Sequence, residues 1–116
     1  MISHQSQVSL AVALLLGAVM LSAGAAHARD PVAGKARAAM CATCHGPLGL
    51  SQLPNAPHLA GQPAIYLVEQ LKNYRSGKRQ NEVMSVIAKP LTDAEIDDLA
   101  AWYASIQISV TEMSKR

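Results

Sequence analysis

The sequence contains no phenylalanine and has few other aromatic residues. One tryptophan and three tyrosines are all that its 116 residues provide. Aromatic side chains bury more apolar surface than most others, so material for a bulky core is scarce. A domain of this size is also marginally stable, because it buries only about 60 to 65% of the surface that its unfolded chain exposes. The sequence therefore predicts that something besides its own side chains completes the core.

Three further shortages exclude whole classes of protein. Lys and Arg together exceed Asp and Glu by only two charges, which argues against a nucleic-acid partner, because such proteins usually present a strongly basic surface. We find no residue run typical of a β-strand. There is also no internal repeat and no low-complexity linker. The sequence therefore indicates one small domain without a sheet.

Cysteine is scarce too, but the two cysteines present lie in one short motif. They are Cys41 and Cys44, and His45 follows directly. A structural zinc site would need a second paired motif, which the sequence lacks. A thioredoxin-like dithiol would be expected in a strand-rich α/β unit. In a C-x-x-C-H motif both thiols add across the vinyl groups of one haem, and the histidine ligates its iron. The motif therefore predicts one covalently bound haem c, with its macrocycle at the centre of the core.

We interpret residues 1–28 as a secretory signal peptide. An apolar stretch at 8–21 is followed by Ala-His-Ala at 26–28, a cleavage signal of the A-x-A type. The segment before the apolar stretch lacks Lys and Arg, which departs from the usual pattern. An uncleaved anchor is disfavoured, because the apolar stretch is short for a membrane span. Cleavage would leave residues 29–116 as a domain without a transmembrane anchor in the bacterial periplasm, outside the cytoplasm, where haem is attached covalently.

Helical signals surround the motif, and we expect an all-α domain. Helices are predicted over residues 31–40, 63–76 and 93–106. The third has the clearest signals, because Thr92 and Glu95 form a capping box and apolar residues follow at i, i+3, i+4 and i+7.

The segments between the helices are expected to enclose the haem. Residues 46–62 are rich in proline and glycine, which predicts a non-repetitive wrap around one edge of the ring. Residues 79–91 carry Met84 and are expected to close the other face. In the first helix, Gly34 and Ala38 share a face, which would let another helix approach closely.

The order of these elements resembles the class I cytochromes c, and more narrowly the small bacterial cytochrome c-553 and cytochrome c4 type domains. The matching residues are Gly34, CATCHG at 41–46, PHLAGQ at 57–62, Tyr66, Gln70-Leu71, SGKR at 76–79, Met84, LTD at 91–93 and LAAWY at 99–103. The resemblance covers nearly all of residues 29–116. It implies the small cytochrome c fold, in which helices wrap around one haem and the first and last helices cross near Gly34 and Trp102. It also implies His45 and Met84 as axial ligands, although relatives often show a pair of methionines where this chain has one.

The residues themselves also favour Met84 as the second ligand. A thioether is a soft ligand that favours ferrous iron and raises the reduction potential. After residue 28 the other methionines are Met40, beside the haem motif, and Met113, near the end of the chain. The alternative is that Met84 only fills a gap in the core, as methionine often does.

His58 is the remaining rival as a ligand. By the resemblance it lies on the side of His45, so we interpret it as a loop or surface residue. The resemblance also implies that the carbonyl of Pro57 accepts the free ring N–H of His45, an arrangement that commonly orients a metal-bound histidine. A plain loop proline is the alternative.

Four basic residues gather at the end of the second predicted helix, namely Lys72, Arg75, Lys78 and Arg79. They indicate either a docking patch for an acidic redox partner, with Arg79 near a haem propionate, or a solvated helix end that complements its own dipole.

The aromatic residues Tyr66, Tyr74 and Trp102 are expected to pack in the core or the haem pocket. A tyrosine hydroxyl or the tryptophan N–H could then reach a propionate.

Together these features predict a periplasmic one-haem electron carrier rather than an enzyme. Both axial positions would be filled, so the protein would pass one electron through an exposed haem edge to redox protein partners such as an oxidase, reductase or dehydrogenase. Two alternatives remain open. One is an electron-transfer subunit bound permanently to a dehydrogenase or oxidase, and the other is a gas-binding haem protein, which would need an open axial position.

Overall fold

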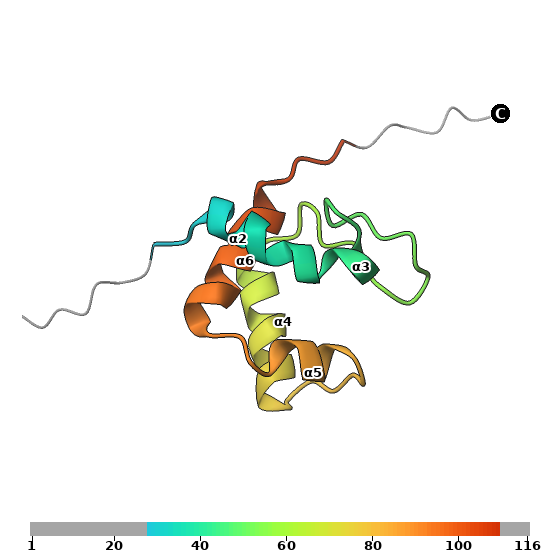
Figure 1. Cartoon of the computed structure of the whole chain (residues 1–116), viewed down its shortest axis with the longest axis vertical. Helices are drawn as coiled ribbons and strands as arrows, with labels where there is room; N and C mark the ends of the chain where they lie inside the picture. The colour runs from blue at the N-terminus through green and yellow to red at the C-terminus, as the bar shows by residue number, and fades with distance from the viewer. Residues whose placement is uncertain (1–27, 110–116) are drawn as a thin grey trace, which may run out of the picture.

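The computed structural model describes residues 28–109, which form a small helical domain (Figure 1). Its elements are α2 (Pro31–Arg37), the 3₁₀ turn η2 (Ala38–Met40), α3 (Ala42–His45), α4 (Ala64–Ser76), α5 (Met84–Ala88) and α6 (Asp93–Ser105). Residues 28–109 contain no β-strand, so the all-α prediction is confirmed. The predicted signal peptide lies almost wholly outside the described residues.

The three predicted helices are present with small differences. The first divides into α2 and η2, so the chain tightens just before the haem motif. Pro63 precedes α4 as its cap residue instead of opening the helix, and α6 ends at Ser105. Residues 79–91 were expected to be a loop, but they contain α5. That expectation was wrong because five residues are too few to show a helical period.

Helices α2 and α6 cross at Gly34, as the resemblance implies. A Cβ atom on Gly34 would overlap the carbonyl oxygen of Asp98 and lie 3.0 Å from the Cβ atom of Trp102. Asp98 also accepts the backbone N–H of Asp30 at 2.8 Å, and Asp30 caps α2 by accepting the N–H of Val32 at 2.8 Å. The start of the described chain is therefore fastened to the last helix.

The predicted capping box begins α6. The N–H of Thr92 donates to the Glu95 carboxylate at 2.8 Å, and the N–H of Glu95 donates to the Thr92 hydroxyl at 3.2 Å. This hydrogen bond to the backbone N–H of Thr92 is the main cause that lowers the pKa of Glu95. The cap fixes where the helix starts, and hence which face it turns to the core.

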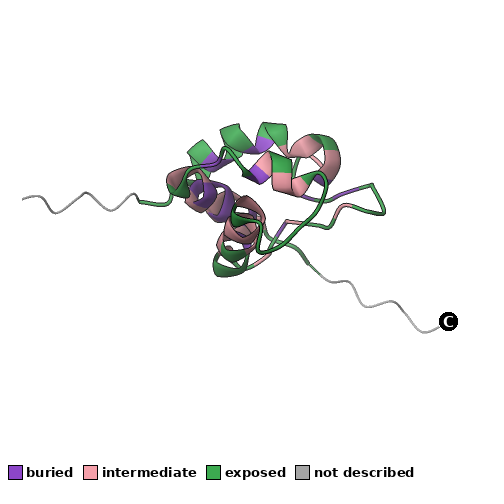
Figure 2. Ribbon diagram, turned by 90° about the horizontal axis from the view of Figure 1, so that it is seen from below, coloured by how far each residue is buried: buried purple, intermediate pink, exposed green. Residues whose placement is uncertain are grey.

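The protein core is small and aliphatic. Ile96 and Leu99 are the largest fully buried side chains of residues 28–109, and Leu67, Leu91 and Tyr103 join them in one cluster. Figure 2 shows exposed positions along much of the loop chain and the outer helix faces. The side chains alone make only a modest core, as the lack of phenylalanine predicts.

Candidate haem site

A cavity of about 450 Å³ lies beside this core. Cys41, Cys44 and His45 line it from the region of α3, and Met84 lines it from the start of α5. In Figure 1, α3 and α5 lie well apart, one near each end of α4. The structure therefore brings all four predicted site residues to one cavity, from two separate segments.

Local geometry explains how the C-x-x-C-H motif presents its side chains. Cys41 immediately precedes α3, and its carbonyl accepts the N–H groups of Cys44 at 3.2 Å and His45 at 3.0 Å. A single tight turn therefore holds both thiols and the imidazole at the cavity. No disulfide joins Cys41 to Cys44. Burial raises the pKa of the Cys41 thiol, while the Tyr103 hydroxyl and the charge of Arg37 act in the opposite direction.

The His45 ring is fixed by the loop that follows the motif. Nδ1 of His45 lies 2.8 Å from the carbonyl oxygen of Pro57. A carbonyl can only accept, so Nδ1 carries the proton and Nε2 keeps its lone pair. The ring is also buried, with 7% of the residue exposed. The expected contact with Pro57 is confirmed, and it leaves the imidazole in the tautomer that a metal ligand needs.

Ser51 ties the same loop to the motif, and the sequence reasoning missed this residue. Its hydroxyl donates to the carbonyl of Cys44 at 2.8 Å, and its N–H donates to Nδ1 of His58 at 2.9 Å. His58 is an exposed loop residue, as predicted, and its ring holds the loop. A lone serine in a loop carries no sequence signal of this role, because the contact depends on how the loop folds back.

Gly49 shows why that loop needs its glycine. Its φ is +75°, and a Cβ atom there would lie 2.8 Å from both the N atom of Ala60 and the Cδ1 atom of Tyr103. A side chain would be strained and would push the loop away from α6.

The segment that carries Met84 is less firmly fixed than the segment that carries His45. Met84 is half-buried, and its neighbours Val83 and Val86 are 57% and 69% exposed. Asn81 caps the turn before α5, because its side-chain oxygen accepts the N–H groups of Val83 at 3.0 Å and Met84 at 2.9 Å. The sequence reasoning did not find Asn81. An Asn three residues before a short apolar run is the signal that could have identified it.

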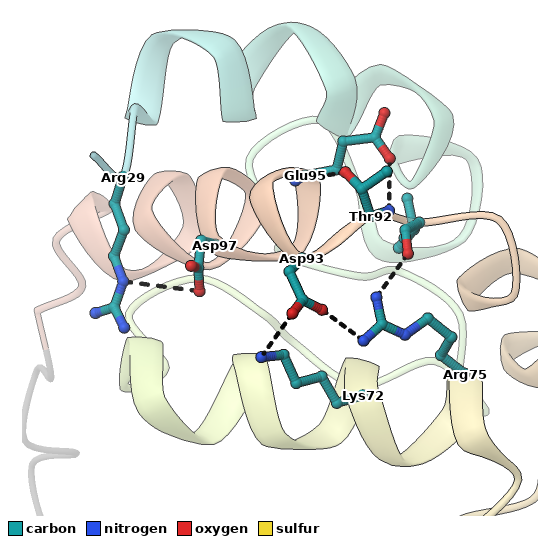
Figure 3. Close-up of polar contacts among 8 residues, drawn as sticks. Arg29, Lys72, Arg75, Thr92, Asp93, Glu95 and Asp97 are labelled. Atoms are coloured by element: carbon teal, nitrogen blue, oxygen red, sulfur yellow. Dashed lines mark hydrogen bonds and ion pairs between the residues drawn. The ribbon is translucent and has the colours of Figure 1, made fainter. Parts of the chain in front are cut away.

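At its other end, this segment is fastened by Arg75 (Figure 3). The guanidinium of Arg75 donates to the carbonyl of Leu91 at 2.8 Å and to the carboxylate of Asp93 at 2.6 Å. Lys72 lies 3.7 Å from the same carboxylate. The hydrogen bond from Arg75, followed by the charge of Lys72, lowers the pKa of Asp93.

The basic cluster predicted from the sequence is therefore divided. Lys72 and Arg75 are paired with Asp93. Arg79 donates to Gln70 at 2.7 Å and stacks over the ring of Tyr74 at 4.7 Å from its centroid. Because Arg79 and Gln70 line the cavity, Arg79 is the member placed where it could meet a propionate.

The aromatic residues pack in the core or at the cavity as expected. The exception is the contact suggested between the Trp102 N–H and a propionate. Tyr66, Tyr74 and Tyr103 line the cavity, and burial raises the pKa of Tyr103. Trp102 packs against the core near α2, with Lys35 Nζ 5.3 Å from its ring centroid. It does not line the cavity that the described residues form, so the idea that its N–H reaches a propionate there is not supported.

These residues fit a covalently held haem. The cavity has the size of a cofactor site. It presents two thiols and an imidazole with a free Nε2 from one segment and a thioether from another. Tyr103 adds a buried hydroxyl close to the Cys41 thiol. Soft sulfur and imidazole ligands are those that haem iron takes in electron carriers.

The comparisons with known proteins agree with this site. The sequence model described as "Cytochrome c" matches residues 31–107. The chain is 49% identical to a cytochrome c4 from Thiocapsa roseopersicina over 84 residues, which are 72% of this chain and 43% of that protein. It is 40% identical to a cytochrome c-554(548) from Halomonas halodenitrificans over 81 residues, covering 67% of this chain and 98% of that protein.

Two further relatives extend the comparison. A protein named thiosulfate dehydrogenase electron acceptor, from Thiomonas intermedia, is 43% identical over 102 residues, covering 86% of this chain and 44% of that protein. The crystal structure of reduced cytochrome c4 from Pseudomonas stutzeri superposes with a TM-score of 0.66 at 37% identity, covering 72% of this chain and 48% of that one. The chain thus spans less than half the length of the cytochrome c4 relatives that it matches.

The fold and the cavity define an all-α electron-transfer haem protein. The chain belongs to the cytochrome c family, and within it the sequence is similar to part of the cytochrome c4 proteins. It carries covalently bound haem c, as the C-x-x-C-H motif predicts. Among residues 28–109, no helix is long and apolar enough to cross a bilayer.

Proposed function

We propose that this chain is a one-haem, one-electron carrier of the bacterial periplasm, with His45 and Met84 as axial ligands and Cys41 and Cys44 as the thioether anchors. One observation carries the proposal. A single cavity is lined by the motif on one segment and by Met84 on another, and the hydrogen bond to Pro57 leaves Nε2 of His45 free.

Each of these residues has a distinct task. Bound haem c supplies a couple between ferric and ferrous iron that accepts and returns one electron. Cys41 and Cys44 hold the cofactor in place, and Pro57 keeps the His45 ring oriented as the charge on iron changes. Met84 fills the remaining axial position with a soft thioether, which favours the ferrous state and raises the potential. With both positions filled, little rearranges during electron transfer, and the gas-binding alternative is disfavoured.

The partners we propose are redox proteins of the same compartment, without nucleic acid. A dehydrogenase is the donor that the comparisons favour, because relatives at 43% and 39% identity are named thiosulfate dehydrogenase electron acceptors. The same observation keeps open a second candidate function, that of a subunit bound permanently to such an enzyme. Purification of the native protein separates the two, since a free carrier would elute without an enzyme activity.

We further propose that residues 1–28 direct export and are then removed. The sequence supports this by its apolar stretch and by Ala-His-Ala at 26–28. In the structure, the Asp30 N–H donates to Asp98, so the second residue after the proposed cleavage point already belongs to the helical domain.

Two measurements on the exported protein test the proposal. The exported protein is expected to begin at Arg29, and the peptide that contains Cys41 and Cys44 is expected to carry one haem by mass. The dithionite-reduced protein is expected to form no carbon monoxide complex at neutral pH, because Met84 occupies the iron. Rapid and complete carbon monoxide binding by the wild-type protein would contradict the carrier function and favour the gas-binding alternative.

A further inference from the structure

Asn81 supports the backbone of Met84 through a closed set of hydrogen bonds. Its side-chain oxygen accepts the N–H groups of Val83 and Met84 at 3.0 and 2.9 Å. In return, Ser85 Oγ accepts the N–H of Asn81 at 3.0 Å. The N–H of Ser85 donates to the carbonyl of Asn81, also at 3.0 Å. Four hydrogen bonds thus enclose the backbone on both sides of Met84.

This segment has little else to hold it. An isolated helix as short as the five residues of α5 is not stable in water, because nucleation costs more than its few hydrogen bonds return. Packing contributes little, because Ala88 is its only fully buried residue and Val86 is 69% exposed. The first N–H groups of any helix also lack acceptors within the helix. Without Asn81, the N–H of Met84 would have only water.

We propose that Asn81 is a positioning residue for the axial thioether. By capping α5 at the N–H of Met84, it fixes the backbone from which the thioether enters the cavity, and so it limits displacement of Met84 by other ligands. Asn81 itself lines the cavity, which places its cap at the site and not on a remote surface. The inference rests on the proposed function, because it takes Met84 as the ligand.

The alternative is that Asn81 stabilises only the fold. The two roles differ in what they change, since a fold-stabilising cap alters global unfolding, whereas a positioning cap alters competition for the iron. Thr92 provides a matched control, because it caps α6 through the same kind of bond, accepting the N–H of Glu95, and α6 carries no proposed ligand.

The test is imidazole binding to the ferric holoprotein, followed together with the weak far-red sulfur-to-iron absorption band. Asn81→Ala is expected to keep the band at neutral pH and to bind imidazole about fivefold more tightly, the effect of losing one helix cap. Asn81→Asp keeps an acceptor oxygen, so its affinity is expected to stay within about twofold of wild type. Thr92→Ala is expected to lower the denaturation midpoint and leave imidazole affinity unchanged.

The outcomes distinguish failure of the proposed role of Asn81 from failure of the proposed function, in which Met84 is a ligand. A wild-type ferric protein without the far-red band would contradict ligation by Met84. A normal band with unchanged imidazole affinity in Asn81→Ala would overturn the role of Asn81 alone, as would an equal rise in Thr92→Ala. Should Asn81→Ala give no holoprotein, Ser85→Ala removes only the reciprocal bond and is expected to raise the affinity about threefold. No change in that variant would likewise overturn the role of Asn81.

Discussion

The two segments that carry the proposed iron ligands, His45 and Met84, are held very differently. On the histidine side, the C-x-x-C-H motif is held by the contact of His45 with Pro57 and by the hydrogen bond from the Ser51 hydroxyl to the carbonyl of Cys44. It also carries the two cysteines that we propose as thioether anchors. These residues lie close together in sequence, and His45 is 7% exposed. On the methionine side, a short and largely exposed segment depends on a few side-chain hydrogen bonds, made by Asn81 within the segment and by Arg75 outside it.

We infer from this difference which of the two proposed ligands can be displaced from the iron. Arg75 reaches Leu91 across 16 positions in sequence, and loss of that one side chain would leave the end of the segment held only by the packing of Leu91 in the core. Loss of any one contact on the histidine side leaves several others in place. We therefore expect the histidine to stay bound under conditions that release the methionine.

The largest effect is expected from removing the covalent anchor. Cys41→Ser combined with Cys44→Ser leaves no thiol to react with haem, and the small protein core cannot replace the macrocycle. Stable haem-containing protein is expected to be lost, as measured by haem-stained gels and intact mass after export. A normal yield of stable holoprotein from the double variant would contradict the haem c site.

Removing Met84, the proposed second ligand, is expected to change ligand binding and the reduction potential more than it changes folding. Met84→Ala opens one axial position, so the ferrous protein is expected to bind carbon monoxide and the reduction potential to fall, while haem stays attached. Met40→Leu is the matched control, because Met40 also lines the cavity and is the rival thioether. Carbon monoxide binding by Met40→Leu, and none by Met84→Ala, would reverse the assignment.

An intermediate effect is expected from loss of the Arg75 clamp, by which we mean the hydrogen bonds from Arg75 to the Leu91 carbonyl and the Asp93 carboxylate. Arg75→Met keeps the apolar stem but removes the donor to the Leu91 carbonyl, at an expected cost of about 1 to 2 kcal/mol. It is also expected to ease displacement of Met84 by imidazole. Ser51→Ala removes a comparable hydrogen bond on the histidine side, where it is expected to lower stability by about 1 kcal/mol without easing imidazole binding. Equal effects of both variants on imidazole binding would remove the contrast between the segments.

The smallest expected effect is the pH dependence of the stability that Asp93 adds through its pairing with Arg75 and Lys72. The pKa of Asp93 is lowered in the folded protein by Arg75 and then Lys72. A depressed carboxyl pKa adds stability above the ordinary aspartate value of about pH 4, and this is lost as the pH falls through the folded value. Asp93→Asn is expected to be less stable than wild type at pH 7, and the difference is expected to vanish in acid. Denaturation midpoints across this range measure it, and a difference that persists in strong acid would contradict the pairing.

Much of this architecture could be predicted because its signals are local. The C-x-x-C-H motif and the Thr92 capping box each lie within a few residues, and Gly34 marks a close crossing whatever its partner. The hydrogen bond from His45 to Pro57 was implied by resemblance, and the structure confirms it.

The remaining contacts depend on how distant parts of the chain fold together. Ser51 and Asn81 act through backbone groups, which any sequence provides. Nothing in the sequence marks the role of Ser51, and the one local signal for Asn81 is an asparagine just before a short apolar run. Helix α5 was missed because five residues show no period. The basic cluster looked uniform in sequence, but Asp93 pairs with Lys72 and Arg75 only after α6 packs beside α4.

The central claim is that Met84 is held less firmly than His45. A denaturant titration of the ferric holoprotein tests this claim most directly. The far-red sulfur-to-iron band reports Met84, and far-ultraviolet circular dichroism reports the helices. We predict that the band disappears at a clearly lower guanidinium concentration than the helical signal, while the haem stays attached. Coincident transitions, as in two-state unfolding, would show that both sides release together and would contradict this account.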